Sequence, residues 1–395
     1  MKHGVFSLAA AVLVTAAASA SASTNISGYV KSFAVLQDSI DTPVISLPTA
    51  WQSQNSLRLM AERFGESTVT QFHYELSPVL QSRDLAALGR TFNVVSGSYR
   101  LTDPTGVIND ETDKNRWYQN LDRFNIQWQL NAGDLTVGRQ AISLGSARII
   151  NPTDVFLPFD VQTFNTEYRT GVDAIRFQRP LGDLGEFDVG IVLGEDAREE
   201  NSAAFVQVRT NVNGMDLQFA AIRFAEHTLT GGGVQTSLGD FGFWFEIAGV
   251  SGDDSYARAS TGFDYAFNEF VFGQVEYHFN GAGSDEPGDY LGLIDDIAYN
   301  RGGVFLLGKH YLMPSVSIQA GALWTIGLQA IANLSDDSVF TSVSAARSLT
   351  DNLYMDLGVY LFAGDELTLD TTGPVLRSEY GTNPATVYAS LRYYF

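Results

Sequence analysis

Segments in which apolar and polar residues alternate recur along most of this chain. In the clearest one, residues 122–130, Phe124, Ile126, Trp128 and Leu130 alternate with the polar residues Arg123, Asn125, Gln127 and Gln129. Successive side chains of a β-strand point to opposite faces, so this segment predicts a strand with one apolar and one polar face. The same period of two recurs over residues 203–212, 270–279 and 353–362.

The connections between these segments alternate in length. Some are short turns, among them the hairpin signal Asn213-Gly214. Others are long, over residues 145–170, 194–202, 280–302 and 364–384. A soluble β-sandwich shows the same alternation of side chains, but short turns at one rim and long loops at the other are typical of outer-membrane barrels. We therefore predict an all-β protein, a transmembrane antiparallel β-barrel with short periplasmic turns and long extracellular loops.

Both ends of such a chain lie at the short-turn rim, which requires an even number of strands. We predict eighteen, with sixteen as the alternative. Residues 91–101 resemble a strand, but we place them in one long connection near 77–118 that folds into the lumen; two extra strands are the alternative. The predicted strands lie near residues 26–36, 56–64, 68–76, 119–131, 134–142, 171–179, 186–193, 203–212, 215–224, 231–238, 241–251, 256–267, 269–279, 303–309, 316–332, 338–347, 353–363 and 385–395.

The N-terminal residues have the pattern of a targeting segment. Lys2 precedes an apolar run at 5–18, and Ala20-Ser21-Ala22 fits a small-x-small cleavage site. We expect residues 1–22 to be a cleaved signal peptide, with a membrane anchor as the alternative. Residues 23–395 show no linker and are expected to form one barrel domain.

The C-terminal segment predicts a strand that runs to the last residue. Val387, Ala389, Leu391, Tyr393 and Phe395 share one parity. In a closed barrel the last strand pairs with the first, which removes both edges of the sheet. Tyr393 and Phe395 in this context resemble the assembly signal of bacterial outer-membrane barrels, which implies the barrel-assembly machinery as a partner.

Composition narrows the class further. Lys and Arg number 24 against 45 Asp and Glu, a net charge of −21, so nucleic acid is not an expected partner. Cys is absent, which excludes disulfides and thiolate metal sites. Acidic pairs such as Asp253-Asp254 suggest divalent cations, but none has the spacing of a calcium loop, and we interpret them as solvated loop charge. We expect no cofactor and no metal.

Charged and amide side chains on the strands should face the lumen, because ionic groups are costly against lipid. Expected lumen-facing residues are Asn125, Gln127, Gln129, Gln207, Gln274, Glu276 and Arg392. Candidate constriction residues, from the strands and from an inward-folding loop near 145–170, are Arg123, Arg139, Gln140, Arg148, Asp154, Asp160, Glu167, Arg169, Arg176 and Arg209.

Two interpretations of the constriction residues stay open. Opposed rows of Arg and carboxylates would create a transverse field that orients dipolar or charged solutes. Alternatively, these residues pair with one another and brace the barrel. Arg139 shares the parity of Leu135 and Val137, so its lumen-facing placement requires a bulge at Gly138 or a lumen-facing Leu135 near the rim.

Residues 137–176 carry the most distinctive motifs. Residues 138–140 read G-R-Q, residues 151–154 read N-P-T-D, and residues 171–176 read G-V-D-A-I-R. These motifs resemble those of the alginate-export and related porin-like outer-membrane families. The resemblance implies a bacterial outer-membrane barrel with a pore, of about the strand number counted above.

We expect a channel in the outer membrane, beside lipid and lipopolysaccharide, for passive diffusion of small hydrophilic or anionic solutes. An alginate or polysaccharide-export pore and a closed structural or adhesive barrel are the alternatives. We do not expect an enzyme: His73 and His278 lie near Glu75 and Glu276 on polar strand faces, but no Ser lies at a recognisable motif spacing from them.

Overall fold

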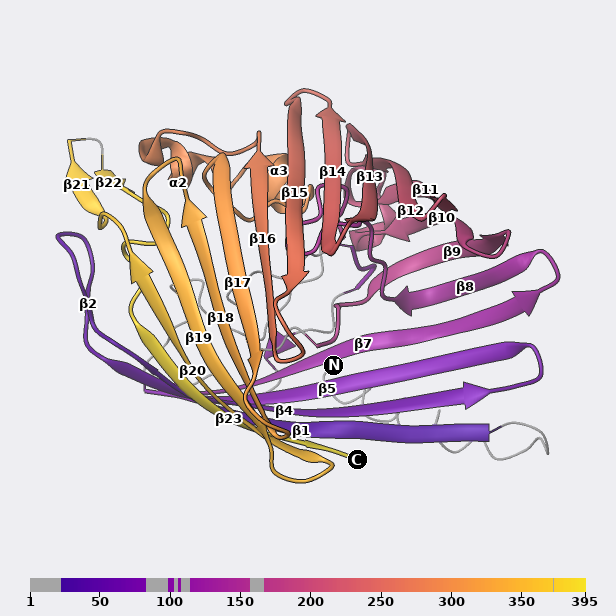
Figure 1. Ribbon diagram of the computed structural model, residues 1–395, viewed down its shortest axis with the longest axis horizontal. Coiled ribbons are helices and arrows are strands. Elements are labelled where there is room, and N and C mark those ends of the chain that lie inside the picture. Colours follow the sequence, from indigo (N-terminus) through magenta and orange to yellow (C-terminus); the bar gives the residue numbers. More distant parts are fainter. Residues whose placement is uncertain (1–22, 83–98, 103–105, 108–113, 157–166, 372) are drawn as a thin grey trace.

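The computed structural model describes residues 23–82, 99–102, 106–107, 114–156, 167–371 and 373–395 of the 395-residue chain. Within them, one sheet contains nineteen strands, and eighteen remain once the two-residue β6 (Gly106–Val107) is set aside. The sheet curves around and closes on itself (Figure 1). Its long strands are β1 (Ser23–Gln37), β4 (Ala50–Phe64), β5 (Thr68–Gln81), β7 (Asn115–Leu130), β8 (Gly133–Gln140), β9 (Val172–Leu181), β10 (Gly185–Leu193), β11 (Ala203–Val212), β12 (Met215–Phe224), β13 (His227–Leu238), β14 (Phe241–Ser251), β15 (Tyr256–Ala266), β16 (Val271–Asn280), β17 (His310–Gln319), β18 (Trp324–Asn333), β19 (Ser338–Ser348), β20 (Leu353–Ala363) and β23 (Thr386–Tyr394).

The described connections contain two small hairpins and a few short helices. The hairpins pair β2 (Ile40–Asp41) with β3 (Ser46–Leu47), and β21 (Thr368–Asp370) with β22 (Gly373–Val375). The helices are η2 (Glu195–Ala197), η3 (Glu199–Asn201), η4 (Pro287–Asp289), α2 (Tyr290–Leu293) and α3 (Ile297–Asn300). In the part of the chain that the structure describes, no helix is long and apolar enough to cross a membrane.

The first and last strands close the ring. β1 pairs antiparallel with β23 from Tyr29↔Tyr394 to Gln37↔Thr386, and its other edge pairs with β4. The backbone of Phe395 continues this ladder through two hydrogen bonds with Gly28, of 2.9 and 3.0 Å. The predicted pairing of the last strand with the first is confirmed, and the closed sheet has no free edge.

The outward-facing side chains of the strands are mostly apolar, and most of their polar side chains point inward. On β14, Phe245 and Ile247 are 38% and 47% exposed, whereas Glu246 between them is 0% exposed and Trp244, on the same face as Glu246, is 1% exposed. A soluble sheet buries its apolar face, and a membrane barrel exposes it to lipid. The alternation that predicted these strands therefore separates the two surfaces of the barrel wall.

The two rims differ in the length of their connections. At one, the short-turn rim, no connection exceeds four residues: 65–67, 131–132, 182–184, 213–214, 239–240, 267–270, 320–323 and 349–352. The opposite, long-loop rim carries residues 38–49, 82–114, 141–171, 194–202, 281–309 and 364–385. It also carries three short connections, at 225–226, 252–255 and 334–337. One rim therefore has only short turns, as predicted, whereas the other has long loops and short turns.

The predicted number of eighteen strands is confirmed, but two predicted strands were misplaced. Residues 303–309 are irregular, and the segment predicted as one strand over 316–332 belongs to β17 and β18. The turn between them is closed by a 2.9 Å bond from the Ala320 amide to the Trp324 carbonyl, with Gly321 at φ 81°. This turn lies within an apolar stretch without Asn, Asp or Pro, so the sequence gives little sign of it.

Candidate functional site

The connection between β8 and β9 folds into the barrel. This inner loop, residues 141–171, is described over 141–156 and 167–171. Glu246, buried on the inner face of β14, accepts hydrogen bonds from the amides of Ser146, Ala147 (2.9 Å) and Thr153 (2.8 Å), and from the hydroxyls of Ser146 and Thr153. Such charge-assisted bonds are about twice as strong as neutral ones, so Glu246 fixes the loop to the wall.

A second carboxylate holds the same loop two strands away. Glu276 on β16 is buried and accepts bonds from the amides of Arg148 (3.1 Å), Ile149 (3.1 Å) and Ile150 (2.8 Å). On the strand between, the Ser260 hydroxyl donates to the Ile150 carbonyl at 2.7 Å. We call Glu246 and Glu276 the carboxylate clamps. They supply acceptors to loop amides that have no sheet partner.

The returning part of the loop is attached to a different wall. Glu167 accepts bonds from the Lys31 ammonium on β1 (2.6 Å) and the Tyr394 hydroxyl on β23 (2.7 Å). Burial alone would raise the pKa of Glu167, but these two bonds outweigh it, and the pKa lies below its ordinary value. The Arg58 guanidinium of β4 lies 4.4 Å from the centre of the Tyr168 ring.

These two attachments lie on nearly opposite sides of the ring. From β15, the ladder reaches β1 in seven steps, through β16, β17, β18, β19, β20 and β23. Half of the eighteen-strand ring is nine steps. The inner loop therefore spans the lumen from one wall to the other.

A bulge in β7 helps to fix the end of the inner loop. Register shifts where β5 faces β7, and both Asp122 and Arg123 are buried. Asp122 accepts a 2.9 Å bond from the Gly171 amide and pairs with Arg123 at 2.7 Å. Arg123 also donates to the Arg169 carbonyl at 2.5 Å. Arg169 in turn pairs with Asp154, whose pKa burial raises against the opposing effect of that guanidinium.

The position of Arg139 differs from the expectation. Gly138 has φ 117°, but β7 and β8 pair without a register shift, so the bulge proposed from parity is absent. The Arg139 side chain is buried between its neighbours on β7 and β9 and is not directed at the pore. It donates to both Asp173 carboxylate oxygens at 2.8 Å, to the Leu121 carbonyl (2.9 Å) and to the Thr102 carbonyl (2.8 Å).

Other predicted constriction residues, and the predicted lumen-facing Arg392, are also bonded within the wall. Arg176 and Asp188 form two bonds through Arg176 Nε, of 2.9 and 3.1 Å. Arg392 bonds both oxygens of Asp356, at 2.6 and 2.7 Å. The Gln140 amide donates to nearby backbone carbonyls at 3.3–3.4 Å. For these residues the geometry supports the interpretation in which paired charges brace the barrel.

The predicted lumen-facing amides lie on the inner face of their strands. Asn125 is buried and donates to the Arg139 carbonyl at 2.7 Å, and Gln127 donates to Asp134 at 3.0 Å. Gln207 is buried on β11, and Gln129 is exposed near the short-turn rim. Side-chain parity on the strands was therefore sufficient to place them.

Arg148 and Arg209 are less enclosed than the other predicted cations. The Arg148 side chain is 51% exposed, lies 3.5 Å from Asp264 and stands 5.7 Å from the Trp244 ring centre. Arg209 reaches the Ser143 carbonyl of the inner loop at 3.5 Å. Asp160 lies outside the described residues. Arg148 is therefore the predicted cation best placed to meet a solute.

A panel of neutral polar side chains continues from Asp264 along the inner wall. Strand register places Asp264, Gln274, Ser315, Gln329 and Ser342 in one row across β15–β19. A hollow of about 270 Å³ lies here, and its polar lining consists of Gln274, Ser315, Ser317, Gln329, Ser342 and Ser344. We call these six residues the polar panel. Arg148 stands at its Asp264 end.

The described part of the connection between β5 and β7 also reaches inside. Tyr99 is buried, packs edge-on against Phe156 at 5.2 Å between ring centres and donates to the Arg301 carbonyl at 2.8 Å. Arg100 donates to the Gly171 carbonyl at 2.9 Å. Residues 99–101 are irregular, and residues 91–98 of the predicted strand-like segment lie outside the described residues.

A third carboxylate holds loops at the long-loop rim. Glu379 accepts bonds from the Tyr311 hydroxyl (2.6 Å), the Asn333 amide group (2.9 Å) and the Leu307 backbone amide (3.1 Å). Burial raises the pKa of Glu379 to about 7. Here the carboxylate belongs to the loop 364–385, and it joins that loop to β17, to β18 and to the loop 281–309.

Comparison with known proteins supports the fold and not the family suggested by the motifs. No protein-family model and no curated protein sequence matches the chain. Solved structures with a similar fold include Pseudomonas aeruginosa OccD3 (8% identity, TM-score 0.53), covering 94% of this chain and 91% of that one. The outer membrane protein OprD from Pseudomonas aeruginosa has 11% identity and a TM-score of 0.55, and the match covers 94% of this chain and 93% of that one. Acinetobacter baumannii OccAB3 has 10% identity and a TM-score of 0.54, and the match covers 94% of this chain and 99% of that one. At these identities the likeness establishes a porin-like β-barrel fold and gives no support to the alginate-export resemblance.

Several residues of the site were not predicted from the sequence. Glu246 is the main one, and its only signal is a lone carboxylate in the apolar stretch F-W-F-E-I of residues 243–247. Lys31 gives a similar signal, because it is the one charged residue in the sequence of β1 and lies on its inner face. Asp122 gave no signal, because its inward placement depends on the bulge in β7.

Proposed function

We propose that this protein is an outer-membrane channel through which small hydrophilic solutes diffuse passively. The observation that carries the proposal is the inner loop, which is attached to nearly opposite walls of a closed barrel. The outer face of this barrel is apolar and its inner face polar, as a water-filled pore through a membrane requires. A loop fixed across such a pore narrows it, so that solutes pass beside the loop.

The charges beside the inner loop favour small solutes that are neutral or anionic. Arg169, Arg176 and Arg392 are bonded to carboxylates, so their fields largely cancel. Arg148 also pairs with Asp264, at 3.5 Å, but its side chain remains half exposed at that end of the polar panel. Solutes would pass between Arg148 and the panel, where the guanidinium attracts an anionic group and the panel replaces water around a polar one.

Planar-bilayer recording tests this proposal. We expect unitary conductance steps from the pure protein and a weak anion preference in the reversal potential across a salt gradient. Arg148→Gln should move the reversal potential toward cations. Arg179→Gln removes the same charge from an exposed, outward-facing position near the short-turn rim and should leave it unchanged. A strong cation preference of the unmodified protein would contradict the role given to Arg148.

The alternatives give different results in the same preparation. A correctly folded barrel that shows no unitary steps is a closed structural or adhesive barrel. A polysaccharide-export pore would pass acidic oligosaccharides faster than neutral sugars of equal size in liposome flux. The ion pairs that neutralise the inner cations argue against that pore, because a long polyanion needs a continuous unpaired basic surface.

Location in the bacterial outer membrane is part of the proposal. Residues 1–22 would direct export, and the outer face of the barrel would contact lipid and lipopolysaccharide. Tyr393 and Phe395 would bind the barrel-assembly machinery. Deleting Phe395 should reduce the amount of folded barrel in the outer-membrane fraction, and Phe395→Tyr, which keeps an aromatic end, should restore it. Equal amounts from both variants would remove Phe395 from the signal.

The proposal includes no catalytic role for the contact between Ser260 and His278 on the inner wall. Ser260 Oγ lies 2.8 Å from His278 Nδ1, a distance that also suits a nucleophile and its base. However, the Ser260 hydroxyl donates its proton to the Ile150 carbonyl, so the ring nitrogen must be the donor in this contact. The pair therefore works as part of the attachment of the inner loop.

A further inference from the structure

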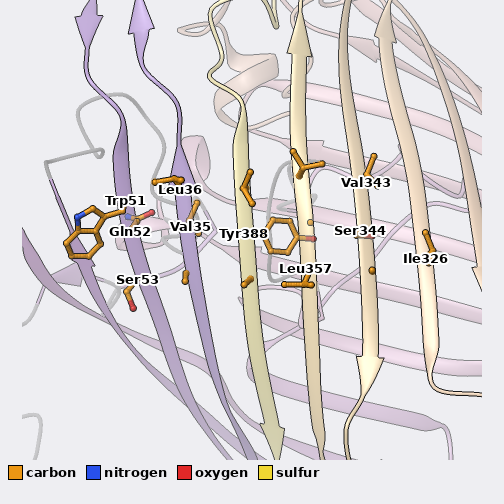
Figure 2. A pocket seen from close by; sticks show the side chains of 16 residues that line it. Val35, Leu36, Trp51, Gln52, Ser53, Ile326, Val343, Ser344, Leu357 and Tyr388 are labelled. Atoms are coloured by element: carbon orange, nitrogen blue, oxygen red, sulfur yellow. The ribbon is translucent and has the colours of Figure 1, made fainter. Parts of the chain in front are cut away.

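The outer wall of the barrel carries a groove with no part in the proposed transport. It has a volume of about 700 Å³ and crosses the six neighbouring strands β4, β1, β23, β20, β19 and β18 (Figure 2). Strands in a sheet lie about 4.8 Å apart, so the groove is roughly 24 Å long. One leaflet of a membrane is about 15 Å deep, half of a ~30 Å hydrocarbon core. A single acyl chain fits within the length of the groove.

The register of the strands creates this outer groove. One row of directly paired, outward-facing side chains is mostly small and forms the floor: Ser53, Ala34, Ala389, Leu357 and Ala345. The next row toward the long-loop rim is larger and forms one side: Trp51, Leu36, Val387, Val359 and Val343. Small side chains beside bulky ones leave a depression about one side chain deep.

The row on the other side of the floor ends in a cation beside an aromatic ring. Arg347 is exposed, pairs in register with Met355 and Trp324, and lies 5.3 Å from the Trp324 ring centre. No ion pair joins it to a carboxylate among the described residues. Trp324 is the first residue of β18, at the short-turn rim. Trp and Arg at a membrane rim lie where the lipid headgroups lie.

The outer groove descends from one rim to the other. Trp51, at its far end, is the second residue of β4 and lies near the long-loop rim. Ile326, which lines the near end, lies two residues after Trp324. The apolar floor thus runs obliquely through the membrane-facing band and reaches the short-turn rim beside Arg347.

We infer that the outer groove binds one phospholipid from the leaflet at the short-turn rim. The acyl chain lies along the floor, and the phosphate accepts hydrogen bonds from the Arg347 guanidinium, whose planar donors match phosphate oxygens. A second copy of the chain fits less well, because the convex wall of another barrel cannot enter so narrow a depression. The inference rests on the proposed membrane location and is independent of transport.

Native mass spectrometry of the purified barrel in detergent tests the lipid site. The probes are 1-palmitoyl-2-oleoyl-phosphatidylglycerol and the diacylglycerol with the same chains. We expect one retained phosphatidylglycerol per barrel. Arg347→Gln should weaken its binding about fivefold, the effect of one cation near an anionic lipid, and should leave diacylglycerol binding unchanged. Ala389→Leu, which fills the floor, should weaken binding of both lipids.

The control for charge is Arg179→Gln, on β9 at the same rim, which should bind as the unmodified protein does. By the shorter way round the ring, through β8, β7, β5, β4, β1, β23 and β20, β9 lies eight strands from β19. Equal phosphatidylglycerol binding by all variants would overturn the inference. The chain has no Cys, so Ala389→Cys gives a single thiol. Rapid disulfide-linked dimers of this variant in membranes would place a second copy on the groove and also overturn it. Because binding is measured in detergent, these outcomes do not depend on whether the barrel conducts.

Discussion

Replacing Glu246 by Gln should release part of the inner loop while the barrel stays closed. The substitution keeps the shape of the side chain and changes one carboxylate oxygen to an NH₂ group. Glu246 Oε2 serves the amides of Ser146 and Ala147, and Oε1 serves the amide of Thr153. Whichever oxygen is replaced, at least one buried N–H then faces another donor, whereas the two hydroxyls can rotate to other acceptors.

The size of the effect follows from these bonds. A buried N–H without an acceptor costs about 1–3 kcal/mol, and each amide bond that loses its charged acceptor weakens by about 1 kcal/mol. With one amide unpaired and two weakened, the clamped state loses about 3–5 kcal/mol. At 1.4 kcal/mol per factor of ten, this shifts the ratio of clamped to released loop on the order of 100-fold or more.

Single-channel recording is the assay for this release. The unmodified protein should conduct at one steady level, and Glu246→Gln should fluctuate among additional, larger levels as the loop leaves the wall. Glu269→Gln is the matched control, since it removes the same charge from an exposed turn at the short-turn rim. Folding is checked by the mobility of unheated samples on gels. A quiet Glu246→Gln channel with unchanged conductance would refute the clamp.

Three further outcomes test other parts of the structure. Glu167→Gln removes the negative charge that faces the buried Lys31 ammonium and, at about 2–3 kcal/mol for a pair with one partly exposed member, should also increase single-channel current noise. Gly138→Ala should lower the unfolding temperature of the barrel in detergent, because φ is 117° there and a Cβ would lie 2.3 Å from a neighbouring carbonyl oxygen; Gly249→Ala, with open space, should not. The folded pKa of Glu379 is raised from 4.5 to about 7, so its contribution to stability is full below pH 4.5 and is lost as the pH rises through 7. Hydrogen exchange over residues 376–385 should accordingly be faster at pH 8 than at pH 5 after correction for intrinsic rates, and Glu379→Gln should remove that difference.

The strands could be predicted because their signal is local. A period of two is visible within one segment, and both faces of residues 122–130 lie as the alternation predicts, apart from the bulge at Asp122. The merged prediction over 316–332 failed at a turn in which Gly321 is the one residue typical of turns. Neighbouring strands also made some contacts predictable in principle: Arg176 and Asp188 belong to one hairpin, closed by residues 182–184.

The attachments of the inner loop could not be predicted in the same way. Glu246 binds backbone amides, and every residue except proline has one, so no residue type in the loop reveals the contact. The far attachment joins Lys31 to Glu167, 136 positions away in the sequence. Such contacts depend on which strands lie on facing walls once the barrel has closed, and this is a property of the whole barrel. For Arg139 a clear sequence signal led to a wrong position. This charged residue of a distinctive motif was predicted to lie in the lumen, but it is bonded to Asp173 in the wall.

Holding the inner loop through its backbone separates two tasks. The clamps bind the amides of Ala147, Arg148 and Ile149, so the side chains at these positions take no part in holding the loop to Glu246 and Glu276. The Arg148 side chain is therefore free to face the polar panel while its own amide is fixed by Glu276. A loop held through its side chains would lose its position whenever a lining residue changed. Here residues 147–149 can vary without moving this part of the loop, because its backbone is held by two glutamates on the wall.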